Sequence, residues 1–296
     1  SLVGSEMCIR DSSILNSLEE TVRDASNAIM EVYEKDTYEQ EIKTDGSPVT
    51  EADNKANDII IKSLKEITPQ IPIVSEETYN KNEQKPEGPY WLVDPLDGTK
   101  EFINKSKDFT VNIALIENAA PVFGIVGAPA TGEVWSGSFF QEPGPGINLS
   151  SMLRGLQEKL SLKMGGLSKK DEHLRIVMSK SHQTETDKNF LEHIFAQDIS
   201  FDVVERGSSL KLCALADNKA DIYPRFGPTS EWDIAAGHAY LLNNGGKVCQ
   251  MRSGEDLKYT KEETILNPAF AAFRNKALKD RYMPVSYTHL TLPTTD

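Results

Sequence analysis

The sequence predicts an α/β (α+β) fold, and three patterns along the chain support that prediction. Apolar residues recur at steps of three and four near the N-terminus, several short apolar runs lie close together in the middle, and strand and helix patterns alternate toward the C-terminus. The chain has 296 residues, of which 39% are hydrophobic and 26% are charged. These values are typical of a globular protein that buries a sizeable core.

Two amphipathic helices are predicted in the N-terminal part of the chain. Residues 13–35 place their apolar side chains on one face of a helix. The second helix follows Pro48, where Thr50 and Asp53 form a capping pattern, and Pro69 ends it.

Strands are predicted in the next part of the chain. Residues 71–74 and 90–93 are short apolar runs that each end in carboxylates. Residues 110–116, 122–126 and 133–135 are β-rich and are separated by short turn sequences. We expect these three runs to form an antiparallel meander.

The C-terminal part alternates strands and helices, as an α/β unit does. The predicted elements are strands at 174–178, 201–204 and 220–223 and helices at 188–195, 210–216 and 234–243. Between the two parts, segments rich in Pro and Gly flank a basic, helical insertion at 153–162, which we interpret as a peripheral excursion or a domain seam.

We therefore expect two domains. An N-terminal α+β domain at 13–172 carries most of the candidate metal ligands, and a C-terminal α/β domain at 173–284 completes the site. Residues 1–12 and 285–296 match neither a helical period nor a signal peptide. Both resemble translated adaptor sequence, so we expect them to be non-native tails outside the fold.

Composition excludes several classes of partner. The 32 Lys and Arg residues against 45 Asp and Glu residues give a net charge of −13, which disfavours binding to nucleic acid polymers. No apolar run approaches the ~18–20 residues of a membrane span, so no integral membrane segment is expected. Cys8, Cys213 and Cys249 are too scattered for a disulfide framework or a zinc cluster, which favours a reducing, cytoplasmic compartment.

Acidic side chains gather where the predicted elements end: at Asp53, at Glu76, at the pair Asp94 and Asp97, and at Asp233. Taken singly, such acids could cap helices or be solvated charges at strand ends. Carboxylates that converge at neutral pH repel one another unless they share a cation or a proton. Their hard oxygen atoms select Mg²⁺, Mn²⁺ or Ca²⁺.

The sequence DPLDGT at residues 94–99 is the most informative of these segments. Asp94 and Asp97 are three residues apart around a proline, so both carboxylates can face one point, and Gly98 permits a tight backbone there. If Thr99 begins a helix, an anion can dock on its N-terminus. An EF-hand is excluded, because acidic residues are missing at the third and twelfth positions of such a loop.

This segment, together with residues 74–77 (VSEE) and 231–237 (EWDIAAG), resembles the two signature motifs and the metal-binding glutamate of the inositol monophosphatase superfamily. The resemblance extends from about residue 13 to about residue 284. It implies a layered αβαβα sandwich of the inositol monophosphatase or sugar phosphatase type. It also implies Mg²⁺-dependent hydrolysis of phosphate monoesters that Li⁺ inhibits.

Residues 100–102 (KEF), 207–211 (GSSLK) and 223–229 (YPRFGPT) are similar to the 3'(2'),5'-bisphosphate nucleotidase branch of this superfamily. That branch hydrolyses 3'-phosphoadenosine 5'-phosphate to AMP and phosphate, in sulfur assimilation and nucleotide recycling. Inositol phosphatases carry an acidic residue where Arg225 stands, whereas a cation suits a second phosphate. The resemblance therefore implies a small-molecule bisphosphate nucleotide as the substrate.

The resemblance also implies a role for each residue of the site. The metal ligands would hold two or three Mg²⁺ ions, with Mn²⁺ as a substitute: Glu76, Asp94, the Leu96 carbonyl, Asp97 and Asp233. A metal-activated water, oriented by Glu76 and Thr99, would attack the 3'-phosphorus, and Asp53 would shape the metal site or assist Thr99. The substrate-binding residues would be Gly98, Thr99, Lys100, Ser208, Ser209, Lys211, Arg225 and Asp233.

Several alternatives stay open. The same chemistry could act on inositol monophosphate or fructose 1,6-bisphosphate, and the acids could instead form an ion site in a non-catalytic scaffold. Dimers are frequent in the superfamily, so a homodimer stays open, as does loose attachment to the inner face of the cytoplasmic membrane. Lys180 stands where the branch commonly has Arg, which leaves the grip on the 5'-phosphate or base undecided there. The neighbouring His182 is a loop residue or a ligand.

Overall fold

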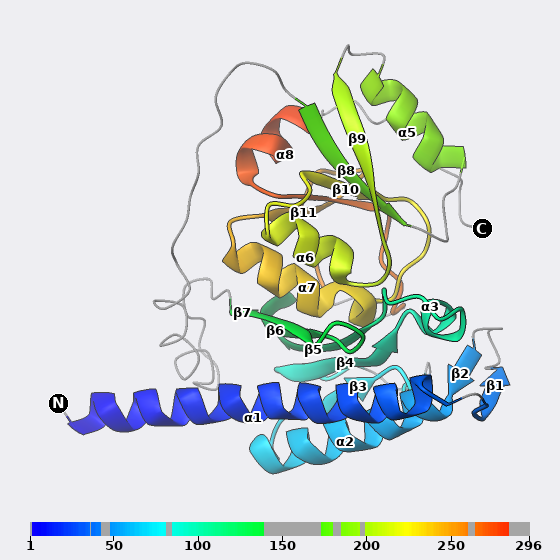
Figure 1. Ribbon diagram of the computed structural model, residues 1–296. Helices are drawn as coiled ribbons and strands as arrows, with labels where there is room; N and C mark the ends of the chain where they lie inside the picture. Colours follow the sequence, from blue (N-terminus) through cyan, green and yellow to red (C-terminus); the bar gives the residue numbers. More distant parts are fainter. Residues whose placement is uncertain are drawn as a thin grey trace.

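The computed structural model describes residues 2–35, 37–42, 48–80, 85–138, 173–179, 185–195, 199–259 and 264–283. Five layers stack in the order helices, sheet, helices, sheet, helices (Figure 1). The predicted α/β class and the layered αβαβα sandwich are therefore confirmed.

The first layer consists of two helices, α1 (Leu2–Tyr33) and α2 (Glu51–Ile67). Helix α1 begins at Leu2 and not at residue 13, because extending a helix that is already formed adds one hydrogen bond per residue. Thr50 and Asp53 form the predicted capping box at the start of α2. In the described part of the chain, no helix combines the length and the apolar character that crossing a membrane requires.

The second layer is a five-stranded sheet with the order β3-β4-β5-β6-β7. Its strands are β3 (Ile73–Ser75), β4 (Tyr90–Asp97), β5 (Thr110–Glu117), β6 (Ala120–Ala128) and β7 (Glu133–Ser138). Strands β4 to β7 pair antiparallel in chain order, which confirms the predicted meander. Successive residues face opposite sides of the sheet, so Ile113 packs against α1 and α2, whereas Ala114 faces the middle layer of helices.

The middle layer consists of α6 (Leu210–Ala216) and α7 (Glu231–Asn243). Helix α7 lies so close to β6 that only glycine fits at position 124, where a Cβ atom would meet the carbonyl oxygen of Ala236 at 2.3 Å. This close packing holds the first turn of α7, which carries Asp233, over the first sheet.

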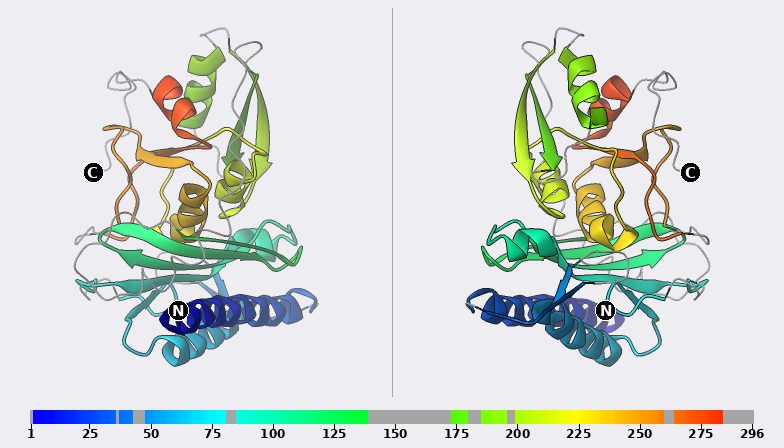
Figure 2. Two further views of the ribbon diagram at one scale, coloured as in Figure 1. Left: turned by 90° about the vertical axis from the view of Figure 1, so that its left-hand side faces the viewer. Right: turned by 90° about the vertical axis from the view of Figure 1, so that its right-hand side faces the viewer.

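The fourth layer is a sheet with the order β11-β12-β10-β8-β9. Its strands are β8 (His173–Ser179), β9 (Ser200–Arg206), β10 (Ile222–Arg225), β11 (Lys247–Gln250) and β12 (Phe270–Phe273). The outer helices α5 (Glu185–Phe195) and α8 (Lys276–Tyr282) complete the stack. Figure 2 shows that β8 and β9 run steeply across the direction of the strands in the first sheet.

Three short elements connect the layers near the site. The antiparallel strands β1 (Gln40–Ile42) and β2 (Pro48–Thr50) link α1 to α2, and α3 (Thr99–Ile103) follows β4. The insertion predicted at 153–162 and the tail predicted at 285–296 lie outside the described residues. The domain boundaries and the non-native character of residues 1–12 stay predictions.

Asp221 ties three strands of the second sheet together from its place just before β10. Its Oδ2 atom accepts a hydrogen bond from Nε of Arg175 on β8, and its Oδ1 atom accepts one from Nε of Arg274 after β12, both at 2.9 Å. Burial alone would raise the pKa of Asp221, but the hydrogen bonds from the two arginines outweigh burial and lower it. The charged carboxylate therefore stabilises the fold.

We expect Asp221→Asn to lower the free energy of unfolding by roughly 3 kcal/mol, because two arginines lose their charged partner. The matched control is Asp202→Asn on β9, whose side chain is 72% exposed and pairs with His173 at the surface. That control should change the free energy by about 0.5 kcal/mol or less. Urea denaturation of both variants measures the difference, and equal losses would contradict the role given to Asp221.

Candidate active site

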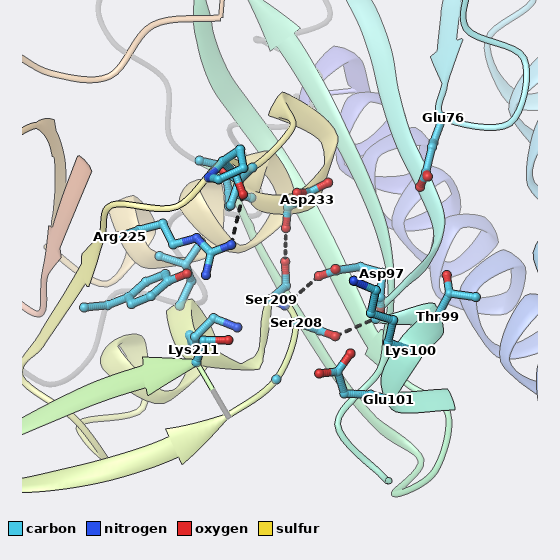
Figure 3. A pocket seen from close by; sticks show the side chains of 18 of the residues that line it. Glu76, Asp97, Thr99, Lys100, Glu101, Ser208, Ser209, Lys211, Arg225 and Asp233 are labelled. Atoms are coloured by element: carbon cyan, nitrogen blue, oxygen red, sulfur yellow. Dashed lines mark hydrogen bonds between the residues drawn. The ribbon is translucent and has the colours of Figure 1, made fainter. Parts of the chain in front are cut away.

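A pocket of about 350 Å³ opens where the first sheet, the middle helices and the second sheet meet. Its volume lies in the range of small-molecule sites, ~300–1,000 Å³. Glu76, Asp97 and Asp233 line one part of the pocket, and Lys211 and Arg225 line the other (Figure 3). The pocket therefore joins an acidic half to a basic half.

Asp94 and Asp97 lie on one strand, at the end of β4, and not in a turn as predicted. Asp94 is paired with Asn112 and Asp97 with Thr110, so β4 has one extra residue between the two aspartates. This β-bulge re-aims the strand toward the pocket. The backbone N–H of Leu96 donates to Oδ1 of Asp94 at 3.0 Å, a local hydrogen bond that stabilises the bulge.

Asp53 joins the start of α2 to the start of α3. Its Oδ2 atom accepts hydrogen bonds from the backbone N–H and the hydroxyl of Thr50, both at 2.7 Å. Its Oδ1 atom lies 3.1 Å from the hydroxyl of Thr99, which is also 3.2 Å from the Leu96 carbonyl. Asp53 is thus both the capping residue and the partner of Thr99, and burial raises its pKa.

Ser208 and Ser209 dock the C-terminal half of the chain onto these acidic residues. The Ser208 hydroxyl donates to the Asp97 carbonyl at 2.8 Å, and the Ser209 hydroxyl donates to the Asp233 carbonyl at 2.5 Å. The backbone N–H of Ser209 donates to Oδ2 of Asp97 at 2.9 Å. Both serines line the pocket, and their hydroxyls are directed at backbone carbonyls.

Burial and neighbouring carboxylates raise the pKa of Asp94, Asp97 and Asp233. Burial raises the pKa of Asp94 well above its usual range, and the charges of Glu76, Asp97 and Asp233 add to this effect. Burial also raises the pKa of Asp97 to about 6, although the nearby Lys211 opposes the rise. The pKa of Asp233 is raised for the same reasons, burial first and then the neighbouring carboxylates. Positive charge bound here would relieve this repulsion.

These carboxylates are chemically suited to a divalent cation. Each of the three aspartates accepts a backbone hydrogen bond on one oxygen, and the other oxygen of Asp97 and of Asp233 accepts none from the described residues. None of the three forms an ion pair within 4 Å in the described ranges. As they stand, no three acidic, His or Cys side chains of the described residues are arranged to hold a metal ion. The donors are therefore present, and binding requires their side chains to shift.

Lys211 and Arg225 form the basic half of the pocket. Burial lowers the pKa of Lys211 to about 8, and its Nζ atom lies 5.6 Å from the centre of the Tyr223 ring. Arg225 donates from Nη2 to the Pro228 carbonyl at 2.9 Å, and its buried Nε atom has no hydrogen-bond partner among the described residues. Lys100 also lines the pocket, whereas Lys180 and His182 lie outside the described residues.

Sequence reasoning missed two residues of the site. Glu101 is buried and lines the pocket directly after Lys100. Asn112 is 1% exposed on β5, and its Nδ2 atom donates to Asp97 and to the Asp233 carbonyl. The available signal for Asn112 was a polar side chain inside an otherwise apolar strand.

Comparison with known proteins defines the class to which this fold and site belong. The sequence model of the inositol monophosphatase family matches residues 11–290. The chain therefore belongs to the inositol monophosphatase family, whose members are typically metal-dependent.

Particular relatives match this chain over nearly their whole length. The 3'(2'),5'-bisphosphate nucleotidase CysQ of Buchnera aphidicola is 40% identical over 263 residues, which cover 88% of this chain and 93% of the relative. The protein of the same name from Escherichia coli K12 is 38% identical over 263 residues, with 87% and 98% covered. The crystal structure of CysQ from Bacteroides thetaiotaomicron has a TM-score of 0.71 at 36% identity and covers 89% of this chain and 97% of that one.

Gly98 controls how closely the Ser208 loop approaches β4. Its φ of +92° is in the left-handed region, and a Cβ atom there would meet the Ser208 hydroxyl oxygen at 2.3 Å. Gly132 has a similar φ of +72°, but a Cβ atom there would meet nothing within 4 Å. A substitution at Gly132 would therefore cause backbone strain alone, whereas a substitution at Gly98 would cause backbone strain and a steric clash.

We expect Gly132→Ala to lower the free energy of unfolding by about 1–2 kcal/mol through backbone strain alone. Gly98→Ala should lower it by a further 1–3 kcal/mol or so, because the Ser208 loop must move away. Urea denaturation of the two variants gives both values. If Gly98→Ala is no more destabilising than Gly132→Ala, the loop is not packed against β4 as described.

Proposed function

We propose that this protein is a Mg²⁺-dependent phosphomonoesterase that removes the 3'-phosphate of 3'-phosphoadenosine 5'-phosphate, giving AMP and phosphate. One observation carries the proposal: a single pocket contains both carboxylates suited to cations and the basic side chains of Lys211 and Arg225. The first half suits a phosphate undergoing hydrolysis, and the second suits another phosphate on the same molecule. The names of the CysQ relatives support the same substrate.

The cation-binding residues of this proposal are Glu76, Asp94, the Leu96 carbonyl, Asp97 and Asp233. Two or three Mg²⁺ ions, or Mn²⁺ in their place, would supply neutralisation of phosphate charge and a more acidic water. Oxygen donors of this kind are those that Mg²⁺ prefers. The Leu96 carbonyl lies 3.2 Å from the Thr99 hydroxyl, so binding of a cation to this carbonyl would leave the hydroxyl to donate to Asp53 alone.

Thr99 and Asp53 form a path for a proton next to the reacting phosphorus. Because the Thr99 hydroxyl donates to Oδ1 of Asp53, its oxygen lone pairs are left to accept a hydrogen bond from water. Glu76, on the same side of the pocket, would accept a hydrogen bond from the second hydrogen of that water and so orient it. The water oxygen forms a bond to phosphorus as the bond from phosphorus to O3' breaks. One proton of the water passes through Thr99 to Asp53, and O3' takes up a proton from solvent.

The remaining pocket residues would hold the substrate. Gly98, Thr99 and Lys100 lie beside the acidic half and would face the phosphate that is hydrolysed. The residues that would face the rest of the nucleotide are Ser208, Ser209, Lys211 and Arg225, with Asp233 near the scissile bond. The Nε atom of Arg225 has no partner among the residues that the structure describes, which supports a phosphate contact because an unsatisfied buried donor is unfavourable.

We further propose that the protein acts in the cytoplasm, in nucleotide recycling linked to sulfur assimilation. Its buried cysteines Cys213 and Cys249 are free thiols, which suits a reducing compartment. A homodimer is compatible with this role.

A panel of substrates tests the proposed function. We expect Mg²⁺-dependent phosphate release from 3'-phosphoadenosine 5'-phosphate at a kcat/KM at least tenfold above that for inositol 1-phosphate or fructose 1,6-bisphosphate. Chelation with EDTA should abolish release from every substrate, and Asp97→Asn should do the same because a cation ligand loses its charge. Preference for another substrate, or full activity in EDTA, would contradict the proposal.

Charge reversal at Arg225 tests the basic half separately. Arg225→Glu should lower kcat/KM for the bisphosphate nucleotide roughly 30- to 100-fold, because a charged hydrogen bond is replaced by repulsion. Turnover of inositol 1-phosphate should change less than threefold. Arg252→Glu, at an exposed turn outside the pocket, is the charge-matched control and should match the wild type. Equal losses on both substrates would show that Arg225 does not select the second phosphate.

A further inference from the structure

Asn112 stands where the pattern of β5 calls for an apolar side chain. The even-numbered residues Ala114 and Ile116 pack in the core that includes α6 and α7, and Asn112 lies on the same face of the strand. Only 1% of Asn112 is exposed. A buried amide is less favourable here than an alkyl group unless its hydrogen bonds are satisfied.

The strand register puts Asn112 beside both aspartates of β4. It is directly paired with Asp94, and paired residues of antiparallel strands project on the same face of the sheet. The bulge in β4 then brings Asp97 opposite Thr110, two residues away on the same face of β5. Asn112 is therefore flanked by the two carboxylates.

Asn112 and Ser209 come from opposite halves of the chain and donate hydrogen bonds to the same two acceptors. The Nδ2 atom of Asn112 lies 3.5 Å from Oδ2 of Asp97 and 3.4 Å from the Asp233 carbonyl. Ser209 donates its backbone N–H to that Oδ2 atom at 2.9 Å and its hydroxyl to that carbonyl at 2.5 Å. Two residues, Asn112 and Ser209, thus each bridge the Asp97 carboxylate and the first turn of α7.

The side-chain oxygen of Asn112 makes this arrangement unfavourable for the stability of the fold. Both neighbours of the amide are acceptors, so the NH₂ group must face them, and the buried Oδ1 atom is left with no hydrogen-bond partner in the described part of the chain. An unsatisfied buried oxygen destabilises the fold. Packing alone does not account for the amide, whereas holding Asp97 against Asp233 does.

We propose that Asn112 is a positioning residue that, with Ser209, keeps Asp97 next to Asp233, so that a shift of their free carboxylate oxygens forms a site for a divalent cation. Because Asp97 is held through Oδ2, its Oδ1 atom is left for the cation. The inference rests on the proposed function only in requiring that these carboxylates bind cations. Outer hydrogen-bond partners of metal ligands commonly contribute 10- to 100-fold to metal affinity.

Binding of Mn²⁺ alone tests the proposal, by isothermal titration calorimetry on the full chain without substrate. Asn112→Leu keeps the shape of the side chain and removes the donor, and it should weaken Mn²⁺ binding 10- to 100-fold. Thr110→Val is the matched control on the same face of β5, because the buried Thr110 hydroxyl has no hydrogen-bond partner within the residues that the structure describes. The control should bind Mn²⁺ within twofold of the wild type.

Kinetics and stability separate positioning from a structural role. At saturating Mg²⁺, Asn112→Leu should lower kcat with little change in KM for the nucleotide, and its stability in EDTA should equal that of Thr110→Val. If Asn112→Leu does not fold, Asn112→Ser, which is too short to reach both acceptors, takes its place with the same expectation. An Mn²⁺ affinity within twofold of the wild type in the variant that folds would overturn the proposal.

The outcome also distinguishes the two proposals. If Mn²⁺ affinity falls in Asn112→Leu while the wild type prefers another phosphate ester, the positioning role stands and the proposed substrate is wrong. If the wild type binds no Mn²⁺, both proposals are wrong.

Discussion

Repulsion among buried carboxylates is the constraint on which the rest of this structure depends. Asp94 and Asp97 come from the first sheet and Asp233 from the middle helices, and burial together with repulsion from neighbouring carboxylates, Glu76 among them, raises the pKa of each. The fold offsets this repulsion with backbone N–H groups, each of which binds one oxygen of one carboxylate. These donors also orient the acids, so the same contacts that make the cluster tolerable leave it suited to cations.

The basic side chains of the pocket do not neutralise its acidic side chains through direct ion pairs. Lys211 and Arg225 form no ion pair with the three aspartates in the described residues, and burial lowers the pKa of Lys211 to about 8. Two opposite charge regions therefore persist side by side in one pocket. Such a pocket favours a ligand with two anionic groups when cations occupy the acidic half, because each region then attracts one group.

Patterns among neighbouring residues predicted most of the fold. The features that they did not predict depend on pairing between distant parts of the chain. The capping box at Thr50 and the alternation of strands and helices depend on neighbouring residues, so the sequence predicted them well. The bulge that puts Asp97 opposite Thr110 depends on register between two strands, and the segment was interpreted as a turn. Asn112 was missed for the same reason, because its meaning appears only when β5 is placed beside β4 and α7.

The acidic site is also a joint between the two halves of the chain. Ser208 keeps a left-handed backbone, with φ of +48°, while its hydroxyl donates to the Asp97 carbonyl. A residue other than glycine holds such a conformation when its surroundings require it. Separation of the halves would break the hydrogen bond from Ser209 to Asp97 and the hydrogen bond from Asn112 to the Asp233 carbonyl. Correct docking of α6 and α7 on the first sheet and assembly of the site are therefore one event.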